Sequence, residues 1–234
     1  MATTSANANM TVKITMNDRN NPPGKLADAE LCFTDGALAG LKLIGFGGID
    51  AVVIDYNQPK TLRAAFQGCD RLFLLEPNAL NQTELELNAV EAAKAAGVRH
   101  IVKQSVMGAA EEAYSLAKIH RPVEKAIEGS GLAWTFLRPN SFMQNAVTFM
   151  AQTIRAEGAF YSASGQARIS HVDVRDIAAV AVTALRAPGH EGKIHTLSGP
   201  EALTYDDMAD ELSKALDRAI RHISLHADGQ EMAR

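Results

Sequence analysis

Two residues near the middle of the chain have the types and spacing of a general acid. Tyr114 and Lys118 form a Y-x-x-x-K string, which places the two side chains one turn apart on a helix. A phenol can donate a proton to a reacting oxygen, and a nearby cation stabilises the phenolate that remains. The alternative is two unrelated residues, because a spacing of four is easily met by chance. Tyr114 and Lys118 are therefore a candidate catalytic pair.

Histidines offer further candidates for proton transfer or metal binding. His120 and Glu124 are four residues apart, so the alternative to a catalytic His120 is a pair on the helix surface that stabilises the helix by roughly 0.2–0.5 kcal/mol. His171, Asp173 and His195 contain metal-binding groups, but no further ligand stands at helix or hairpin spacing to them. Asp173 is instead predicted to cap the helix that follows it. We expect no metal site.

The composition excludes several classes of function. The chain has 234 residues, 47% of them apolar, and a formal net charge of −4. A groove for nucleic acid needs clustered Lys and Arg, so nucleic acid is not an expected partner. No run approaches 18 apolar residues, so no membrane span is expected. The two cysteines, Cys32 and Cys69, cannot form a disulfide framework, which favours a cytoplasmic location.

Predicted strands and predicted helices alternate along the chain, and these elements must position the candidate residues. Short apolar runs predict strands at Val12–Met16, Ala51–Asp55, Arg71–Leu75, His100–Gln104, Ala133–Leu137, Lys193–Leu197 and Ile223–His226. Longer stretches with helical spacing predict helices at Pro59–Gln67, Asn81–Ala96, Ile119–Glu128, Asn140–Ala156, Val174–Arg186 and Tyr205–Leu216. The middle strands are continuously apolar, as expected when helices cover both faces of a parallel sheet. The pattern predicts an α/β fold with a mainly parallel, doubly wound sheet.

Helix ends and domain limits can also be predicted. Thr204 with Asp207 resembles a capping box, and Gly97 and Gly129 stand where a left-handed residue ends a helix. We expect a disordered polar tail at residues 1–10, a core at 11–156 and a smaller C-terminal lobe at 157–234, interleaved with the last strands. This division follows the loss of strand patterns after about Ala156.

Three strings give the chain a specific resemblance. They are VRHIVKQS at 98–105, SGLAWTFLRPNSFMQN at 130–145 and HVDVRDIA at 171–178. In this order and spacing they resemble the NmrA-like, atypical short-chain dehydrogenase/reductase family, from about Val12 to the end of the chain. The resemblance implies a Rossmann-like fold and an NAD(P)H-dependent oxidoreductase that passes a hydride to a small quinone, azo, imine or carbonyl substrate.

The resemblance also implies roles for individual residues. Ser105 would stand near the nicotinamide, and His120 aligns with a basic residue of the family that touches the ribose or relays a proton. Leu116 then occupies the family's tyrosine position. Arg19 resembles the basic residue that holds a 2′-phosphate, so NADP is favoured and NAD remains possible. The other residues implied to bind the cofactor are Asp55, Tyr56, Leu75, Glu76, Pro139, Asn140, Ser141 and Phe142.

One expected motif has no counterpart in the chain. A dinucleotide-binding fold opens with a strand, a glycine-rich loop and a helix that receives the pyrophosphate. Gly45–Gly48 precedes the predicted strand at Ala51–Asp55 instead of following one. If Val12–Met16 is the family's second strand, the first βα unit is missing. The alternatives to a reductase are then a regulatory protein that binds cofactor weakly or not at all, a non-redox isomerase or cyclase, or a truncated reading of a reductase gene.

Overall fold

The computed structural model describes residues 11–16, 27–32, 55–76 and 79–225, the first two segments by their backbone alone. The chain divides into two compact units. The first consists of Met1–Arg138 with Val180–His195, and the second of Pro139–Ala179 with Thr196–Arg234. The predicted strand at Ala51–Asp55 falls, except for Asp55, outside the described residues, as do Arg19, Gly45–Gly48 and the tail at 1–10.

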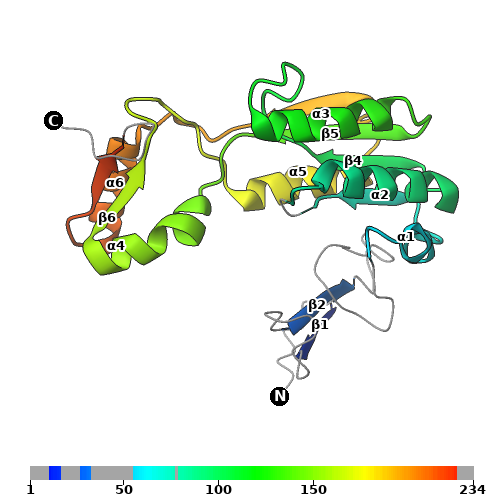
Figure 1. Cartoon of the computed structure of the whole chain (residues 1–234), viewed down its shortest axis with the longest axis horizontal. Coiled ribbons are helices and arrows are strands. Elements are labelled where there is room, and N and C mark those ends of the chain that lie inside the picture. Colours follow the sequence, from blue (N-terminus) through cyan, green and yellow to red (C-terminus); the bar gives the residue numbers. More distant parts are fainter. Residues whose placement is uncertain (1–10, 17–26, 33–54, 77–78, 226–234) are drawn as a thin grey trace. The chain divides into compact units, whose positions relative to one another are not determined.

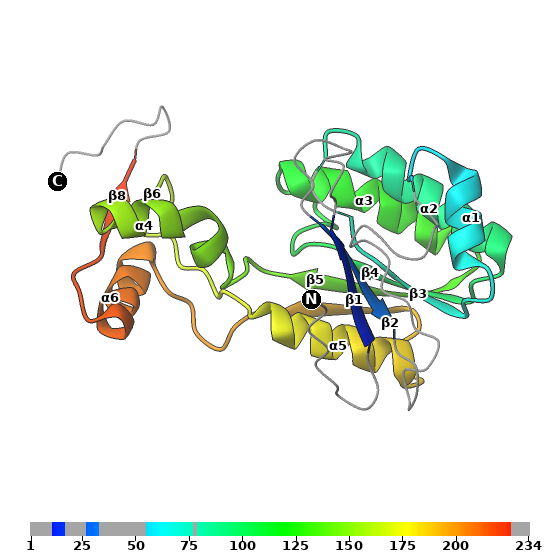
Figure 2. The same cartoon turned by 90° about the horizontal axis from the view of Figure 1, so that it is seen from below.

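A four-stranded sheet organises the first unit, in the order β3-β4-β5-β7. The strands are β3 (Arg71–Leu74), β4 (His100–Gln104), β5 (Ala133–Pro139) and β7 (Lys193–Leu197). β3 pairs in parallel with β4, and β4 in parallel with β5. Helices α1 (Pro59–Phe66), α2 (Gln82–Ala96) and α3 (Ser115–Glu128) lie on one face of the sheet, and α5 (Val174–Arg186) on the other (Figures 1 and 2). The predicted doubly wound, mainly parallel fold is confirmed.

The first predicted strand has a different partner from the one expected. β1 (Thr11–Met16) covers the predicted Val12–Met16, but it pairs antiparallel with β2 (Ala27–Cys32), a strand that the sequence pattern did not predict. The two form a sheet of their own. The interpretation of Val12–Met16 as a strand of the parallel sheet was therefore wrong. An apolar run identifies a strand but not its partner, since pairing depends on contacts with distant segments.

The helices up to α3 mostly follow their predicted ends, with two differences. Gly97 ends α2 in the left-handed conformation, as predicted, but Gly129 stays right-handed at φ −82° and the chain turns at Gly131 instead. α3 begins at Ser115, four residues before the predicted Ile119. Pro122 lacks a backbone N–H and is most easily placed near a helix start, yet the helix continues on both sides of it.

The helix predicted at Asn140–Ala156 begins later than expected. It consists of a π-helical turn, η2 (Ala146–Met150), followed by α4 (Ala151–Glu157). Phe142 instead forms a bridge with Val172, and the Ser141 carbonyl accepts from the Val172 N–H. The Ser141 carbonyl and the Met143 N–H are bonded to Val172, so the helix begins only beyond them, and its first turn starts with the bond from the Asn145 N–H to the Phe142 carbonyl. The predicted boundary at residue 156 falls inside α4, whereas the two units divide at Pro139.

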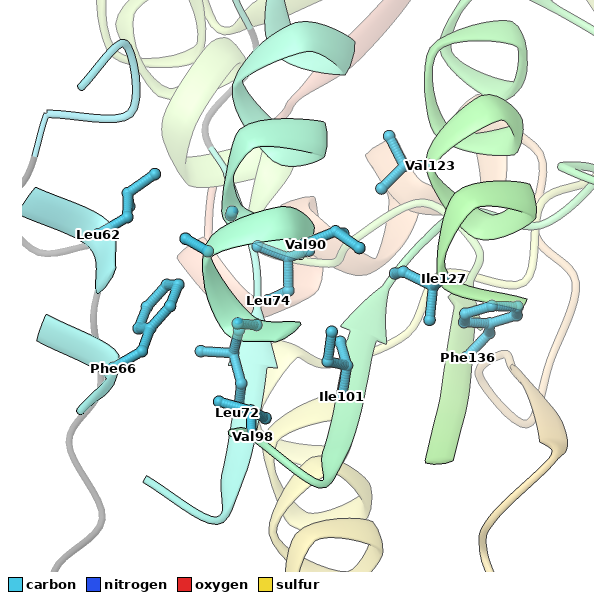
Figure 3. Close-up of a cluster of buried hydrophobic side chains, with 13 residues drawn as sticks. Leu62, Phe66, Leu72, Leu74, Val90, Val98, Ile101, Val123, Ile127 and Phe136 are labelled. Atoms are coloured by element: carbon cyan, nitrogen blue, oxygen red, sulfur yellow. The ribbon is translucent and has the colours of Figure 1, made fainter. Parts of the chain in front are cut away.

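An apolar cluster between the sheet and α1–α3 holds the first unit together (Figure 3). Leu62 and Phe66 of α1 meet Leu72 and Leu74 of β3, and each of these four side chains is almost fully buried. Burying a side chain of this size contributes about 1.5–3 kcal/mol. Val90, Ile101, Val123, Ile127 and Phe136 extend the cluster across α2, β4, α3 and β5. The cluster anchors the carboxyl ends of β3 and β4, where polar side chains collect.

The second unit has a smaller core. β6 (Ala159–Ser162) pairs in parallel with β8 (Arg221–Ser224), and α6 (Tyr205–Leu216) and α4 supply the other apolar side chains. Ile154, Phe160, Ala209 and Ile220 form this cluster. β8 lies two residues earlier than the predicted Ile223–His226. Within the residues that the structure describes, no helix is both long and apolar enough to cross a membrane.

Both predicted N-caps form. Asp173 Oδ1 accepts from the Arg175 N–H at 2.8 Å, at the start of α5. Thr204 Oγ1 accepts from the Asp207 N–H at 3.0 Å, and the Asp207 carboxylate accepts from the Thr204 N–H at 2.9 Å. The capping box of α6 is complete, and it satisfies two backbone donors that the helix itself leaves unpaired.

We expect Thr204→Ala to destabilise the second unit by about 1 kcal/mol, the usual cost of losing an N-cap oxygen. Urea unfolding followed by circular dichroism would measure the change. Thr204→Ser is the matched control because it keeps the oxygen, and it should retain most of the stability. Equal losses in the two variants would contradict the assignment of the effect to the cap.

Candidate active site

A buried ion pair lies behind the carboxyl end of β4. Lys103 Nζ lies 2.7 Å from Glu86 Oε1 of α2, and both side chains are fully buried. Nζ also donates to the Gln104 carbonyl at 3.1 Å. Burial lowers the pKa of Lys103 and raises that of Glu86, and their mutual attraction opposes both shifts. The pair therefore places a compensated positive charge inside the first unit.

His120 lies beside this pair and is also buried. Its Nδ1 is 4.0 Å from Glu86 Oε2, and the residue is 5% exposed. Burial, together with the charge of Lys103, lowers the pKa of His120 to about 3. The imidazole is neutral at physiological pH, so it can exchange hydrogen bonds but cannot act as a cation. The alternative of a solvated surface pair with Glu124 was wrong, because both side chains are buried.

The residues at the end of β3 connect to the same network. Leu75 and Glu76 follow the strand directly and are half-buried. Burial raises the pKa of Glu76, and a hydrogen bond with the Tyr56 phenol opposes that shift. Burial, followed by the charge of Glu76 and the same hydrogen bond, raises the pKa of Tyr56. Tyr56 is thus a neutral donor to a carboxylate that partly faces solvent.

Asp55 serves a local role next to Tyr56. Its Oδ1 accepts from the Asn57 N–H at 2.9 Å, and its Oδ2 from Gln58 Nε2 at 2.9 Å. The backbone hydrogen bond from Asn57 is the largest cause of the lowered pKa of Asp55. The carboxylate is therefore ionised in the turn that leads into α1.

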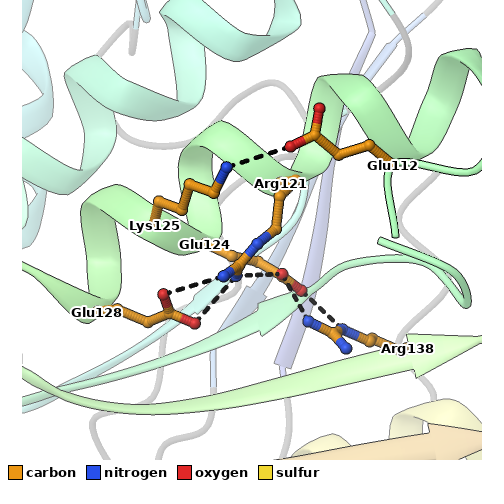
Figure 4. Close-up of polar contacts among 6 residues, drawn as sticks. All are labelled: Glu112, Arg121, Glu124, Lys125, Glu128 and Arg138. Carbon is orange, nitrogen blue, oxygen red and sulfur yellow. Dashed lines mark hydrogen bonds and ion pairs between the residues drawn. The ribbon is translucent and has the colours of Figure 1, made fainter. Parts of the chain in front are cut away.

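A second buried carboxylate ties α3 to the end of β5. Glu124 is fully buried and accepts from Arg138 at 3.0 and 2.8 Å and from Arg121 at 3.0 Å (Figure 4). Arg121 also bonds Glu128. Burial raises the pKa of Glu124, but hydrogen bonds from Arg138, Ser105 and Arg121 outweigh burial and lower it. Glu124 is consequently ionised and holds Arg138, the residue at which the first unit's segment Met1–Arg138 ends.

Ser105 lies where this anchor meets the sheet. It follows β4, and its N–H donates to the Leu137 carbonyl at 2.7 Å. The hydroxyl is close enough to Glu124 to lower the pKa of that carboxylate, yet its oxygen has no partner of regular hydrogen-bond geometry among the described residues. A buried hydroxyl without such a partner is costly. Ser105 is thus held against Glu124 at the carboxyl edge of the sheet, and its oxygen keeps unused capacity to accept a hydrogen bond there.

Tyr114 and Lys118 do not form the expected pair. Tyr114 is the N-cap of α3, and its hydroxyl donates to the Met107 carbonyl at 2.8 Å. Burial raises its pKa, whereas a proton donor assisted by lysine needs a lowered one. Lys118 is exposed, and the structure brings the two residues together only through a backbone hydrogen bond.

The loop that follows β5 belongs to the second unit. The Asn140 N–H donates to the Leu197 carbonyl at 2.8 Å, and the Asn140 side chain accepts from the Ser141 N–H at 2.8 Å. Asn145 Nδ2 lies 3.3 Å from Ser141 Oγ. Pro139 is buried, and Phe142 is half-buried. Backbone bonds thus hold the Pro139–Phe142 segment in one conformation, with the Ser141 and Phe142 side chains partly exposed.

The sequence analysis missed Lys103, Glu86 and Arg138. One signal was available for Lys103, since a lysine inside an otherwise apolar strand that is covered on both faces must be buried and paired. The sequence held no comparable signal for Glu86, because α2 carries several other carboxylates. The partner was selected by the packing of α2 on β4.

Comparisons with known proteins agree with this architecture. A family model described as NAD(P)H-binding matches residues 41–188. The NAD(P)H azoreductase of Xenophilus azovorans is 38% identical over 189 residues, which cover 80% of this chain and 65% of that protein. Quinone oxidoreductase 2 of Escherichia coli K12 is 32% identical over 179 residues, which cover 76% of this chain and 62% of that protein.

Solved structures give the same result. The NADPH-dependent quinone oxidoreductase of Escherichia coli, complexed with NADPH, superposes with a TM-score of 0.69 at 31% identity, over 76% of this chain and 63% of that one. The Citrobacter sp. triphenylmethane reductase complexed with NADP(H) superposes with a TM-score of 0.67 at 28% identity, over 74% of this chain and 61% of that one. In each of these four comparisons this chain spans less than two thirds of the length of the matched protein. Because the family model covers more than half of the chain and the parallel sheet has the matching fold, the chain belongs to the NAD(P)H-binding family.

Proposed function

We propose that this chain binds NADPH and acts as a reductase of small quinone or azo compounds. The observation that carries the proposal is the similarity, over about four fifths of the chain, to an azoreductase and over about three quarters of it to a quinone oxidoreductase. The proposal includes NADP in preference to NAD, and a cytoplasmic location in keeping with the two cysteines. No nucleic acid or membrane partner is part of it.

The carboxyl edge of the sheet fits a dinucleotide. In open α/β sheets, ligands bind beyond the carboxyl ends of the strands, and the buried Ser105 hydroxyl has no regular partner there among the described residues. We assign Ser105 to the nicotinamide end, Leu75 and Glu76 to the ribose, and Asp55 and Tyr56 to the adenine end. Pro139–Phe142 is assigned to the nicotinamide loop and Arg19 to the 2′-phosphate. When bound, NADPH supplies the hydride.

The protein's own groups position and polarise this edge. The Lys103 charge is attracted to the ionised Glu124 as well as to Glu86, and neutral His120 can exchange a hydrogen bond without adding charge. Tyr114 receives no role in proton transfer, because its hydroxyl is engaged and its pKa is raised. Lys118 is left as a surface residue.

Titration of the full chain with NADPH and NADH, followed by cofactor fluorescence, tests the proposal. We expect saturable binding, tighter for NADPH, and NADPH oxidation when a quinone or an azo dye is added. Arg19→Ala should weaken NADPH binding about tenfold or more, the value of one hydrogen bond to a charged group, and leave NADH binding nearly unchanged.

Arg63→Ala is the matched control, because Arg63 is an exposed arginine of α1 with no assigned role. It should change neither affinity. Absence of binding at millimolar cofactor would overturn the reductase and favour a regulatory protein. Equal weakening of both cofactors by Arg19→Ala would overturn the 2′-phosphate assignment alone.

A further inference from the structure

Three side chains of the second unit form a chain of two hydrogen bonds that the proposed reductase does not use. His222 Nε2 lies 2.9 Å from Ser162 Oγ, and His222 Nδ1 lies 2.9 Å from Asp206 Oδ1. A serine, a base in contact with it and a third group that orients the base are the arrangement that activates a serine nucleophile. The three residues are distant in sequence, so no short motif reveals them.

The fold positions each of the three residues independently. Ser162 is the last residue of β6, and His222 lies on β8, where the parallel register pairs it with Phe160. Asp206 lies in the first turn of α6, directly after Thr204 and Tyr205, and the capping box fixes the start of that helix. Three elements thus converge on one hydrogen-bonded chain.

The imidazole is held in one orientation. The His222 side chain is 1% exposed. Its ring stacks on Phe160, with centroids 5.5 Å apart, and packs against Tyr205, also at 5.5 Å. Packing on both neighbours restricts rotation of the ring, so Nε2 remains directed at Ser162. Such restriction is what a preorganised base requires.

The hydrogen bond to Asp206 indicates which nitrogen of His222 carries a proton. An ionised aspartate only accepts hydrogen bonds, so His222 Nδ1 carries the proton that Asp206 Oδ1 accepts. When the ring carries this one proton, Nε2 has a lone pair that can accept a hydrogen bond from the Ser162 hydroxyl. Gln166 Nε2, at 3.2 Å, donates to the other oxygen of Asp206. This is the protonation state in which the base can take the serine proton.

We propose that Ser162 is a nucleophile toward small activated esters and that the second unit carries an acyl-transfer site. Ser162 Oγ forms a bond to the ester carbonyl carbon while its proton passes to His222 Nε2. The bond from that carbon to the leaving oxygen then breaks, and the leaving alkoxide takes the proton from His222. Water then forms a bond to the acyl carbon while its proton passes to His222 Nε2. The bond from that carbon to Ser162 Oγ breaks, and Oγ takes the proton back, which releases the acid and restores Ser162. Asp206 is a positioning residue, and Ser162 is half-buried whereas His222 is covered.

Covalent labelling of the unmodified full chain tests the proposal without any added cofactor. A fluorophosphonate probe transfers its phosphoryl group to an activated serine oxygen with loss of fluoride. Mass spectrometry of the digested protein should find the adduct on Ser162. The protein should also hydrolyse p-nitrophenyl acetate with saturation, and Ser162→Ala should remove both reactions. His222→Gln should slow them by about 10²-fold or more, the usual contribution of a general base.

Ser164→Ala is the matched control, since it removes a hydroxyl two residues away and leaves the three residues intact. It should keep wild-type labelling. Asp206→Asn should slow labelling and change its pH profile, an effect that a purely structural role would not produce. No adduct on wild-type Ser162, under conditions that label a reference serine hydrolase completely, would overturn the proposal. Equal hydrolysis by wild type and Ser162→Ala would do the same. Neither result bears on NADPH binding.

Discussion

Replacing Lys103 with methionine is expected to lower the free energy of unfolding by about 3–5 kcal/mol, the usual cost of breaking a buried ion pair. The substitution leaves Glu86, which is 0% exposed, without its partner at 2.7 Å. Glu86 must then either remain charged in an apolar environment or take up a proton. Urea unfolding at neutral pH, followed by circular dichroism, would measure the loss.

The surface pair Lys94–Glu91 provides the matched control, on α2, the helix that carries Glu86. Its atoms are 3.3 Å apart, but its side chains are 38% and 72% exposed. Because exposed pairs contribute about 0–1 kcal/mol, Lys94→Met should have a small effect. The double variant Lys103→Met/Glu86→Leu should be much more stable than either single variant, since it leaves no buried charge behind. A loss below about 1 kcal/mol for Lys103→Met would contradict the burial of a charged pair.

Acidification from pH 7 to pH 5 should cost about 2 kcal/mol of stability through His120 alone. The pKa of His120 is about 3 in the folded chain, against an ordinary value of 6.5. At pH 5 the unfolded chain binds a proton at this residue and the folded chain does not, so protonation favours unfolding. The contribution is complete above pH 6.5 and is lost progressively as the pH falls toward 3.

The difference between the wild type and His120→Asn isolates this contribution, because burial also lowers the pKa of His100, His171 and His195. The loss of unfolding free energy between pH 7 and pH 5 should be about 2 kcal/mol smaller in the variant than in the wild type. An unchanged difference would show that His120 titrates normally in the folded chain and is therefore accessible to water.

Local elements were largely predictable from the sequence, and their partners were not. The Thr204 capping box, the Asp173 cap and the left-handed Gly97 depend on residues within four positions of one another. Local hydrogen bonds of this kind are specified by local residue types. Val12–Met16 was correctly predicted as a strand but wrongly assigned to the parallel sheet, because its partner is selected by contacts outside the strand.

The candidate site divides in the same way. The sequence by itself determined the family and most of the strands and helices of the parallel α/β fold, but it predicted neither β2 nor β6, and it proposed Ser105 and His120 as site residues. Only the tertiary structure decided that Lys103 pairs with Glu86, that Glu124 pairs with Arg138, and that Ser162, His222 and Asp206 meet. It also decided that His120 is neutral. The physical reason is that a pKa and an ion pair depend on burial and on neighbours brought together by packing, and neither is a property of adjacent residues along the chain.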